Sequence, residues 1–292
     1  MAVAATGFFD GVHLGHRRVL SRLVEEASSR GEESMVVTFW PHPRTVLQDE
    51  ARSLRLLNSL GEKRDLLAAE GVQRVEVLDF TRDFSSLSTE RYLRMLSSRF
   101  GVTEILLGYD NRIGSDLLRG EEAAAVALRL GMDARVLDPL ELGGVAVSST
   151  KIRTALGECR VEDAAAMLGY NYMLHGVVVA GNRQGRTIGF PTANMQLYEP
   201  LKQLPGRGVY CVDVELQGCK YLGMCNIGVR PTVSGGGALT IETNIFDFDE
   251  DIYGLDLRIR FLRFLRPERR FDSLEDLRAQ LLLDRSLCIA EQ

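Results

Sequence analysis

The stretch Gly7–His16 reads GFFDGVHLGH and comes directly after a short run of small residues, Ala2–Thr6. We expect the short run to form a buried strand and the residues from about 14 onward to form a helix. His13 and His16 are three residues apart at the start of that helix, so their side chains lie on one face. A helix N-terminus offers free N–H groups and positive potential to phosphates. The stretch therefore predicts a nucleotide-binding turn between a strand and a helix.

Strand and helix patterns alternate from this point to about residue 168. The run Ser59–Glu62 has the serine and the glutamate of a capping box, which predicts a helix start, and Gly31 predicts a helix end. Repeated β-α units are typical of a parallel, doubly wound sheet, which binds ligands at the carboxyl ends of its strands. The further strands that we expect are 35–39, 75–78, 104–107 and 134–137, and the helices are 14–31, 59–69, 89–100, 121–130, 150–156 and 162–168.

A second segment suited to phosphate binding, residues 147–153, reads VSSTKIR. Three hydroxyl residues, Ser148, Ser149 and Thr150, precede two cations, one of them Arg153. Hydroxyl groups and cations at a helix start make a cradle for an anion. A plain serine-rich N-cap would have the same composition, but the first segment favours phosphate binding for the second one too.

The pattern changes to period two after Gly169. In 209–216 and again in 255–261, apolar residues alternate with polar ones, and glycine-rich turns separate such runs. Antiparallel strands that close a small barrel or form a sandwich have this pattern. The basic segment 258–266 alternates as well, so we expect much of it to be the solvated face of a strand.

Ser273 and Asp276 resemble a capping box and predict a final helix with Leu274, Leu277 and Leu281 on its apolar face. The change of pattern places the domain boundary near residue 170. We therefore expect two domains, 1–169 and 170–292.

The segment Gly181–Asn194, GNRQGRTIGFPTAN, is dense in glycine and carries two arginines, one of them Arg186. Glycines such as Gly185 let a backbone approach phosphates closely, and arginine adds charge. Thr192 and Asn194 supply neutral oxygens, which Mg²⁺ accepts beside nucleotide phosphates. By composition alone the segment is equally consistent with a plain turn, and it is not a Walker A loop.

Glu242 lies in a strand-like run, 239–248, among apolar and hydroxyl residues rather than among charges. Phosphorylation of a neutral hydroxyl needs a base, and a carboxylate can serve as one. A single glutamate in a strand is usually solvated, so the residue by itself leaves its role open.

The composition argues against several classes of function. A formal net charge of −5 and a pI of about 5.6 do not favour nucleic acid as a partner. The five cysteines are an odd number without a C-x-x-C pair, which argues against a disulfide framework or a zinc site and favours a reducing compartment, the cytoplasm. No apolar run approaches the ~18 residues of a membrane span. Whether the chain forms a homo-oligomer stays open.

The segments Gly7–His16 and 147–153 resemble the motifs of the H-x-G-H nucleotidyltransferase superfamily. The chain as a whole, from about residue 5 to 285, resembles the bacterial bifunctional riboflavin kinase/FAD synthetase family. The family usually has an aromatic residue where Ile113 stands. Gly181–Asn194 is similar to the family signature G-x-x-x-G-R-x-x-G-F-P-T-A-N. Further segments that match the family's flavin- and ATP-side loops are 38–43, which includes His42, and 108–112, which includes Asp110.

The resemblance implies an α/β doubly wound nucleotidyltransferase domain followed by an antiparallel β-barrel domain with a C-terminal helix. It implies two ATP- and Mg²⁺-dependent reactions: phosphorylation of riboflavin to FMN in the barrel, and adenylylation of FMN to FAD in the α/β domain. Glu242 aligns with the catalytic glutamate of the family. His13, His16 and Arg153 would stabilise charge during adenylyl transfer. The expected substrate-binding residues are Gly7, Phe8, Phe9, Asp10, Gly15, His42, Asp110, Ser148, Ser149, Thr150, Gly181, Gly185, Arg186, Thr192 and Asn194, of which Thr192 and Asn194 would also bind the metal.

Three other functions remain open on the residues alone. One is a riboflavin kinase whose adenylyltransferase domain is weak or inactive. Another is a different cytidylyl- or adenylyltransferase joined to an unrelated barrel, against which the P-T-A-N segment argues. The third is a non-catalytic flavin-binding regulator, which would have no need of Glu242 as a base. For the function that the resemblance implies, the expected partners are small molecules, namely riboflavin, FMN and ATP.

Overall fold

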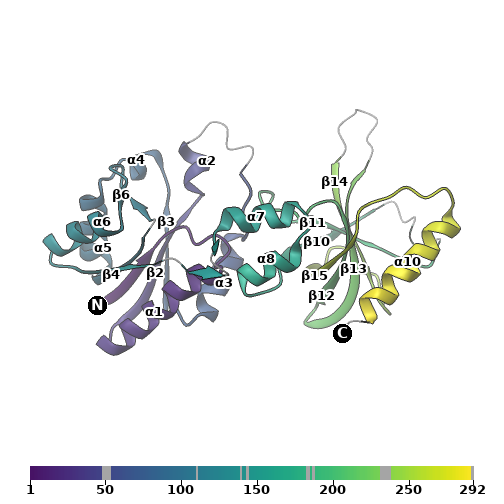
Figure 1. Ribbon diagram of the computed structural model, residues 1–292, viewed down its shortest axis with the longest axis horizontal. Coiled ribbons are helices and arrows are strands. Elements are labelled where there is room, and N and C mark those ends of the chain that lie inside the picture. Colours follow the sequence, from purple (N-terminus) through teal and green to yellow (C-terminus); the bar gives the residue numbers. More distant parts are fainter. Residues whose placement is uncertain are drawn as a thin grey trace. The chain divides into compact units, whose positions relative to one another are not determined.

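The computed structural model describes residues 1–47, 54–109, 111–138, 140–142, 145–181, 185, 188–230 and 238–290. Its contacts divide the chain into two compact units, Met1–Ser149 and Thr150–Gln292. Figure 1 follows the chain from the first unit to the second by colour. Within the described residues, every helix is too short or too polar to cross a membrane.

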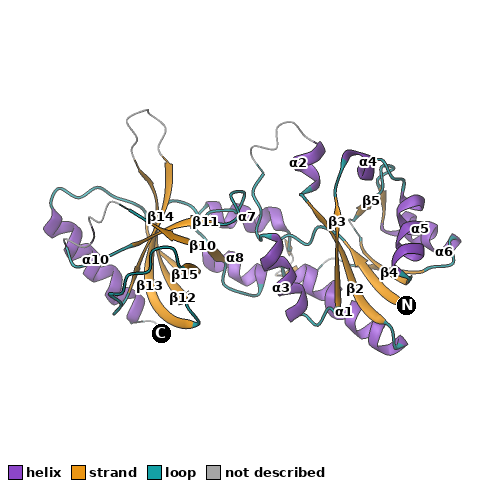
Figure 2. Cartoon of the chain, turned by 180° about the vertical axis from the view of Figure 1, so that it is seen from behind, coloured by secondary structure: helices purple, strands orange, loops and turns teal. Residues whose placement is uncertain are grey.

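The first unit is built on a parallel sheet of five strands in the order β3-β2-β1-β4-β7 (Figure 2). Its central strand, β1, has five buried residues, as the run of small side chains predicts. The chain moves outward from β1 to β2 and β3 on one side, and to β4 and β7 on the other. Ligands bind where the strand order reverses in this way, at the carboxyl ends of β1 and β4. The strands are β1 Ala2–Thr6, β2 Glu33–Trp40, β3 Arg74–Asp79, β4 Val102–Gly108 and β7 Asp133–Leu137.

Helices cover both faces of this sheet, as expected for a doubly wound fold. One core joins Val3 and Ala5 of β1 to residues of α1 and α3, and the other joins Ala2 and Ala4 to α5 and α6. The alternation of strand side chains between two faces explains why neighbouring residues of β1 enter different cores. The capping box at Ser59 is confirmed. The helices are α1 Leu14–Arg30, α2 Pro43–Leu47, α3 Leu60–Ala69, α4 Arg82–Ser85, α5 Thr89–Phe100 and α6 Gly120–Arg129.

Two short strand pairs in the first unit had no signal in the sequence. Each strand is two residues long, too short to show an alternating pattern. The first pair follows β4 and includes Ile113, which is buried. The pairs are β5 Arg112–Ile113 with β6 Leu118–Arg119, and β8 Glu141–Leu142 with β9 Val145–Ala146.

The second unit contains a closed antiparallel barrel in the order β10-β11-β14-β13-β12-β15. Of the two architectures left open by the sequence, the barrel is therefore correct and the sandwich is not. Helix α8 packs against β15 within this unit. The strands are β10 Met173–Val179, β11 Ala193–Leu197, β12 Gly208–Leu216, β13 Cys219–Arg230, β14 Ala238–Ile245 and β15 Asp256–Arg266, and the helices are α7 Ser149–Gly157, α8 Val161–Leu168 and α10 Leu274–Ile289.

The final helix, α10, covers part of the outer face of the barrel. Its Cys288 packs into a cluster with Cys211 of β12 and Met224 of β13, which explains why Cys211 is buried on the face predicted to be polar. Ser273 caps the helix as predicted, by accepting the N–H of Asp276. Leu277 and Leu281 are partly buried, and Leu281 packs against the same cluster, as predicted. The prediction is wrong for Leu274, which lies in the first turn and is 60% exposed.

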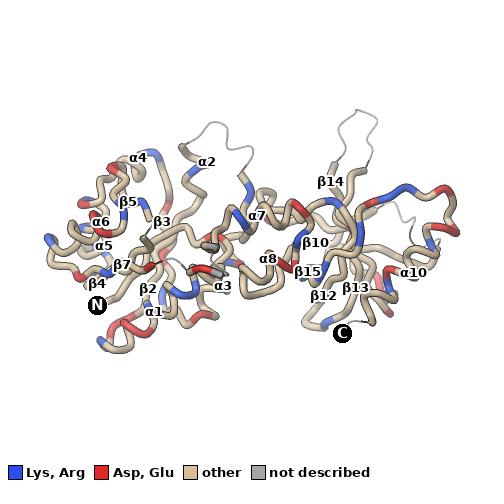
Figure 3. Tube along the Cα trace, in the orientation of Figure 1, with Lys and Arg blue, Asp and Glu red and all other residues tan. Residues whose placement is uncertain are grey.

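The basic strand β15 is only partly solvated. Arg258 and Arg260 both pair with Glu215 of β12 and remain partly exposed, as predicted for a solvated strand face. The prediction fails for Arg266, which forms an ion pair with the buried Asp284 of α10. Elsewhere, basic and acidic residues are interspersed along the trace (Figure 3), in keeping with the small net charge.

Candidate active sites

The segment Gly7–His16 lies at the carboxyl end of β1, where three strands bring their following loops together. The carbonyl of Thr6 accepts a hydrogen bond from the Asn111 amide after β4, at 3.0 Å. The carbonyl of Phe8 accepts one from the hydroxyl of Thr38 on β2, at 3.2 Å. These contacts fix the segment at the position where a parallel sheet binds ligands.

The backbone of this segment is strained. The φ values of Phe9, Gly11 and Val12 are 52°, 88° and 37°. These values lie in the left-handed region, which residues other than glycine rarely adopt. A β-branched residue such as Val12 is especially unfavourable there, and such strain persists only where surrounding contacts enforce it. The turn therefore presents the start of α1 in one fixed geometry.

His13 and His16 form a stacked pair at the start of α1. Their ring centroids are 3.7 Å apart and the rings are nearly parallel, at 13°. His13 is the N-cap, and its Nδ1 accepts the backbone N–H of His16 at 3.3 Å. The prediction that both side chains share one face is confirmed. A Cβ on Gly15 would lie 3.2 Å from the His13 ring, so the glycine leaves room for the pair.

The His16 imidazole is neutral at neutral pH. Burial lowers its pKa well below the usual range, and the nearby His13 and Lys63 lower it further. A neutral His16 donates a hydrogen bond without adding positive charge. Because Nδ1 of His13 is an acceptor, a neutral His13 carries its proton on Nε2.

Asp10, predicted to contact the nucleotide, uses its carboxylate to hold the chain itself. The carboxylate accepts the backbone N–H groups of Leu57, at 3.0 Å, and of Asn58, at 3.4 Å, just before α3. Its backbone carbonyl accepts the Ser149 hydroxyl at 2.8 Å. Ser149, from the second phosphate-type segment, is thus brought to the first segment as expected.

The remaining predicted residues of this site lie in different places. Ser148 is half-buried directly before α7. Thr150 and Arg153 lie on α7 in the second unit. The ring of His42 meets the ring of Phe8 edge-on, with centroids 4.2 Å apart. Asp110 lies outside the described residues.

A largely apolar cavity of about 490 Å³ opens beside Gly7 and Phe8. The aromatic side chains Phe39, Phe80, Phe84 and Tyr92 form much of its wall, and their rings contact one another edge-on or at a tilt. Sequence reasoning singled out only Phe39, as part of segment 38–43, because the other three come from α4, α5 and a loop and converge only in the fold. The other lining residues are Thr6, Pro43, Leu47, Ser85, Leu87, Asn111, Arg112, Ile113, Gly114, Ser115 and Leu117.

In the second unit, Glu242 of β14 lies between two asparagines on neighbouring strands. Strand register pairs it directly with Asn194 of β11 on one side and with Asn226 of β13 on the other. Directly opposed residues of antiparallel strands project to the same face with Cβ atoms ~4.5–5.5 Å apart. Asn226 in turn donates to the carboxylate of Glu268 at 3.2 Å. Glu242 therefore stands in a polar row, not alone on a solvated face.

The glycine-rich segment closes tightly on this row. A Cβ on Gly181 would overlap the side-chain amide of Asn194, and one on Gly185 would overlap the carbonyl of Phe190. Glycine is required at both positions because the backbone approaches its neighbours so closely. Asn244 donates to the carbonyl of Pro191 at 2.6 Å and so ties the segment to β14. Arg186 lies outside the described residues.

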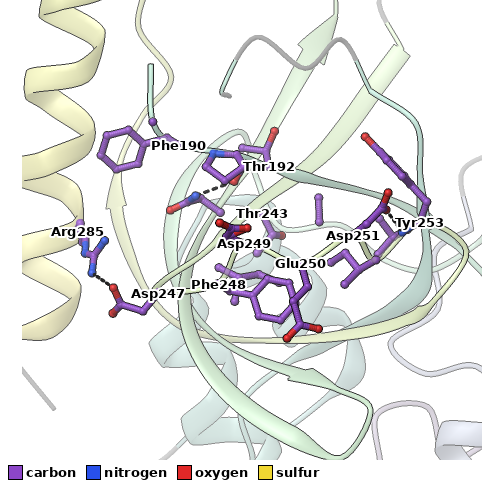
Figure 4. A pocket seen from close by; sticks show the side chains of 17 residues that line it. Phe190, Thr192, Thr243, Asp247, Phe248, Asp249, Glu250, Asp251, Tyr253 and Arg285 are labelled. Carbon is purple, nitrogen blue, oxygen red and sulfur yellow. Dashed lines mark hydrogen bonds and ion pairs between the residues drawn. The ribbon is translucent and has the colours of Figure 1, made fainter. Parts of the chain in front are cut away.

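A cavity of about 650 Å³ begins at Thr192 (Figure 4). Ala193 and Thr243 line it, whereas Asn194 and Glu242, the next residues along these strands, do not. Strand alternation turns Asn194 and Glu242 away from Ala193 and Thr243, toward the side of β14 that carries Asn244, which also lines the cavity. Four carboxylates lie around the cavity, and that of Asp247 pairs with Arg285 of α10 at 2.7 Å. The remaining lining residues are Val178, Gly189, Phe190, Pro191, Asn244, Ile245, Phe248, Asp249, Glu250, Asp251, Ile252 and Tyr253.

Comparison with known proteins places both sites in one family. The FAD synthetase family matches residues 1–151, and the riboflavin kinase family matches residues 168–290. The bifunctional riboflavin kinase/FMN adenylyltransferase of Listeria monocytogenes is 36% identical over 97% of this chain and 90% of its own length. The chain belongs to the bifunctional riboflavin kinase/FMN adenylyltransferase family. The Escherichia coli member is likewise 36% identical over the same shares of the two chains.

A solved structure shares the fold of this family member over its whole length. The crystal structure described as a macrolide-efflux protein from Streptococcus pneumoniae matches 98% of this chain and 93% of that one. The TM-score is 0.91 at 32% sequence identity. The FAD synthetase match falls on the α/β unit, and the riboflavin kinase match falls on the barrel and α10.

Proposed function

We propose that the barrel phosphorylates riboflavin and that the α/β unit adenylylates FMN. As a member of the family, the chain converts riboflavin to FMN and FMN to FAD, with ATP as the second substrate in both steps. The assignment of the kinase reaction to the barrel rests on the row Asn194–Glu242–Asn226. In this row the Glu242 carboxylate stands between two amides, beside the glycine-rich segment. The α/β unit offers stacked imidazoles at a helix start instead.

In the kinase step, Glu242 takes the proton of the terminal ribityl hydroxyl of riboflavin. The freed oxygen attacks the γ-phosphorus of ATP, and the bond from that phosphorus to the bridging oxygen breaks as ADP leaves. Phosphoryl transfer depends mainly on positioning and charge stabilisation. The base contributes by removing the proton of the attacking hydroxyl. The amides of Asn194 and Asn226 flank the carboxylate and orient it toward the hydroxyl.

Thr192 and Asn194 would hold Mg²⁺ beside the phosphates. Both side chains carry neutral oxygens of the kind this ion accepts, and a Cβ on Gly181 would overlap the Asn194 amide, so glycine is needed beside it. When bound, Mg²⁺ neutralises charge on the β- and γ-phosphates. The described residues hold no cluster of three or more His, Cys, Asp or Glu suited to a metal.

The 650 Å³ cavity suits the adenosine part of ATP better than its phosphates. Four carboxylates, from Asp247 to Asp251, repel phosphate groups but accept hydrogen bonds from ribose hydroxyls and an amino group. With adenosine in the cavity, the triphosphate would run past Thr192 toward Asn194. This places the γ-phosphate on the side of the strands where Glu242 lies.

In the adenylyl step, the FMN phosphate attacks the α-phosphorus of ATP and pyrophosphate leaves. This nucleophile is already an anion, so the step needs no protein base. His13 and His16 donate hydrogen bonds to phosphate oxygens as charge moves onto the leaving pyrophosphate. The apolar, aromatic cavity beside Phe8 is large enough for the planar flavin ring.

A Glu242→Gln variant tests the base. Glutamine keeps the size and hydrogen bonds of the side chain but cannot accept the proton, so riboflavin phosphorylation should fall by about 10²–10⁴-fold. Conversion of supplied FMN to FAD should persist. The measurement is chromatography of flavins after incubation with riboflavin or FMN and MgATP.

The matched control is Asp247→Asn, which removes a carboxylate from the cavity but not from the polar row. Near-normal phosphorylation by a folded Glu242→Gln variant, with a large loss in Asp247→Asn, would move the base to Asp247. The same chromatograms separate the alternatives, since wild-type protein that makes only FMN, or no product at all, would contradict the two-activity assignment.

A further inference from the structure

Lys63 lies on α3, outside the motif segments quoted from the sequence, yet it lies close to Phe8 and His16 of the nucleotide segment. Its side chain is fully buried, at 0% exposure. The start of α3 is tied to the nucleotide segment because the Asp10 carboxylate holds the N–H groups of Leu57 and Asn58. These hydrogen bonds bring the start of α3, and with it the Lys63 ammonium, close to the segment that ends in His13 and His16.

The Lys63 ammonium has no hydrogen-bond partner among the described residues. It lies 3.4 Å from the centre of the Phe8 ring. An ammonium has three N–H donors, and the face of one ring replaces only part of what water would give them. Burial of an unmatched cation opposes folding, so the position would favour an apolar residue if packing were its only role.

The surroundings favour an anion rich in oxygen as the missing partner. The nearby Nδ1 of His16 is also buried without a partner in the described part of the chain. Asp10 is close enough to raise the pKa of Lys63, but burial lowers that pKa more, from 10.5 to about 8, so the ammonium remains mostly charged at pH 7. A compact cation on a flexible stem is a common phosphate ligand.

We propose that Lys63 is a phosphate-binding residue of the adenylyl-transfer site, whose unpaired ammonium takes an oxygen of the ATP polyphosphate or of the FMN phosphate. Phe8 also lines the apolar cavity at the end of β1. Lys63 does not itself line that cavity, so contact with a substrate phosphate there requires the Phe8 ring to move aside. The proposal rests on the assignment of FMN adenylylation to the α/β unit.

The test compares Lys63→Met with Arg64→Met. Methionine keeps most of the buried stem and removes the charge, and Arg64 is an exposed neighbour on the same helix whose loss changes the net charge equally. Adenylylation of FMN by Lys63→Met should lose about 10- to 150-fold in kcat/KM, as for one hydrogen bond to a charged group. Riboflavin phosphorylation by the same variant should stay within twofold, and Arg64→Met should leave both reactions unchanged.

The KM values separate the two sources of phosphate. A rise in KM for ATP, with loss of the thermal stabilisation that inorganic tripolyphosphate gives the wild-type protein, identifies the ATP polyphosphate. A rise in KM for FMN alone, with the tripolyphosphate effect intact, identifies the FMN phosphate. Lys63→Arg keeps the charge and should recover part of the activity, which a purely structural position would not require.

The proposal is overturned if Lys63→Met keeps kcat/KM for adenylylation and both KM values within twofold of wild type. If the methionine variant does not fold, Lys63→Gln takes its place, with the same expected loss and the same twofold limit. His16→Ala is the positive control for the underlying assignment. If His16→Ala abolishes adenylylation and Lys63→Met does not, the proposal for Lys63 is wrong and the assignment of adenylylation to the α/β unit stands. If neither variant lowers adenylylation, that assignment itself fails.

Discussion

Replacement of Lys63 by methionine should make the unliganded protein more stable at neutral pH. Burial lowers the pKa of the ammonium from 10.5 to about 8. A difference of this size corresponds to about 3 kcal/mol that the folded state loses by keeping the group charged at pH 7. Methionine removes this cost but also the contact with the Phe8 ring, which contributes about 0.5–2 kcal/mol. The net gain should be about 1–2.5 kcal/mol.

The gain should depend on pH in a defined direction. Below pH 8 the ammonium is protonated in both the folded and the unfolded state, and the full cost is present. Between pH 8 and 10.5 the unfolded chain binds more protons than the folded one, so wild-type stability rises with pH through this group. The advantage of Lys63→Met should therefore be largest at pH 7 and shrink between pH 8 and 10.

Urea unfolding at several pH values measures this difference. Trp40, the single tryptophan of the chain, lies on β2 in the same unit as Lys63 and reports its unfolding by fluorescence. Comparison with wild type cancels the titration of other groups, and Arg64→Met should show no pH-dependent difference. A Lys63→Met variant that is less stable at pH 7, or a difference constant from pH 7 to 10, would refute a desolvated ammonium at this position.

Three further predictions concern the two sites and their boundary. His16→Ala should sharply lower FAD formation and leave FMN formation nearly intact, and an equal loss of both in folded protein would count against separate sites. Gly181→Ala places a methyl group against the Asn194 amide, so riboflavin phosphorylation should fall at least ~10-fold while adenylylation of supplied FMN is unchanged. Residues 150–292 should fold alone and phosphorylate riboflavin, whereas 170–292 should be less stable by more than about 3 kcal/mol because it lacks the buried faces of α7 and α8. Equal urea midpoints for the two fragments would contradict this last expectation.

Much of the fold could be predicted because its signals are local. Buried runs such as Ala2–Thr6 and the alternation in 209–216 depend on side chains a few residues apart. The cap at Ser59 and the glycine stop at Gly31 are also set by neighbours within one helical turn. Alternating patterns also predicted the barrel strands. The choice between barrel and sandwich depends on which strands pair, and the sequence of a single strand does not determine its partners.

The parts of the sites that were missed depend on long-range register. Glu242 stands between Asn194 and Asn226 only because three strands align in one register. The sequence around Lys63 looks like that of any exposed helix, since Arg64 and Asp65 follow it. Its burial follows from the Asp10 carboxylate, more than 50 residues away, which holds the start of α3 against the nucleotide segment.

The first unit supplies less positive charge from its histidines than the H-x-G-H pattern suggests. Burial keeps His16 neutral, and the Nδ1 of His13 is occupied as an acceptor, so the pair offers directed N–H donors but little charge. Adenylyl transfer nevertheless moves negative charge onto pyrophosphate, which some cation must balance. The start of α1 contributes about half a charge, and under the proposal above Lys63 contributes a further full charge. Orientation and charge would then reside in different residues of this site, with the histidines orienting the phosphates and Lys63 stabilising their charge.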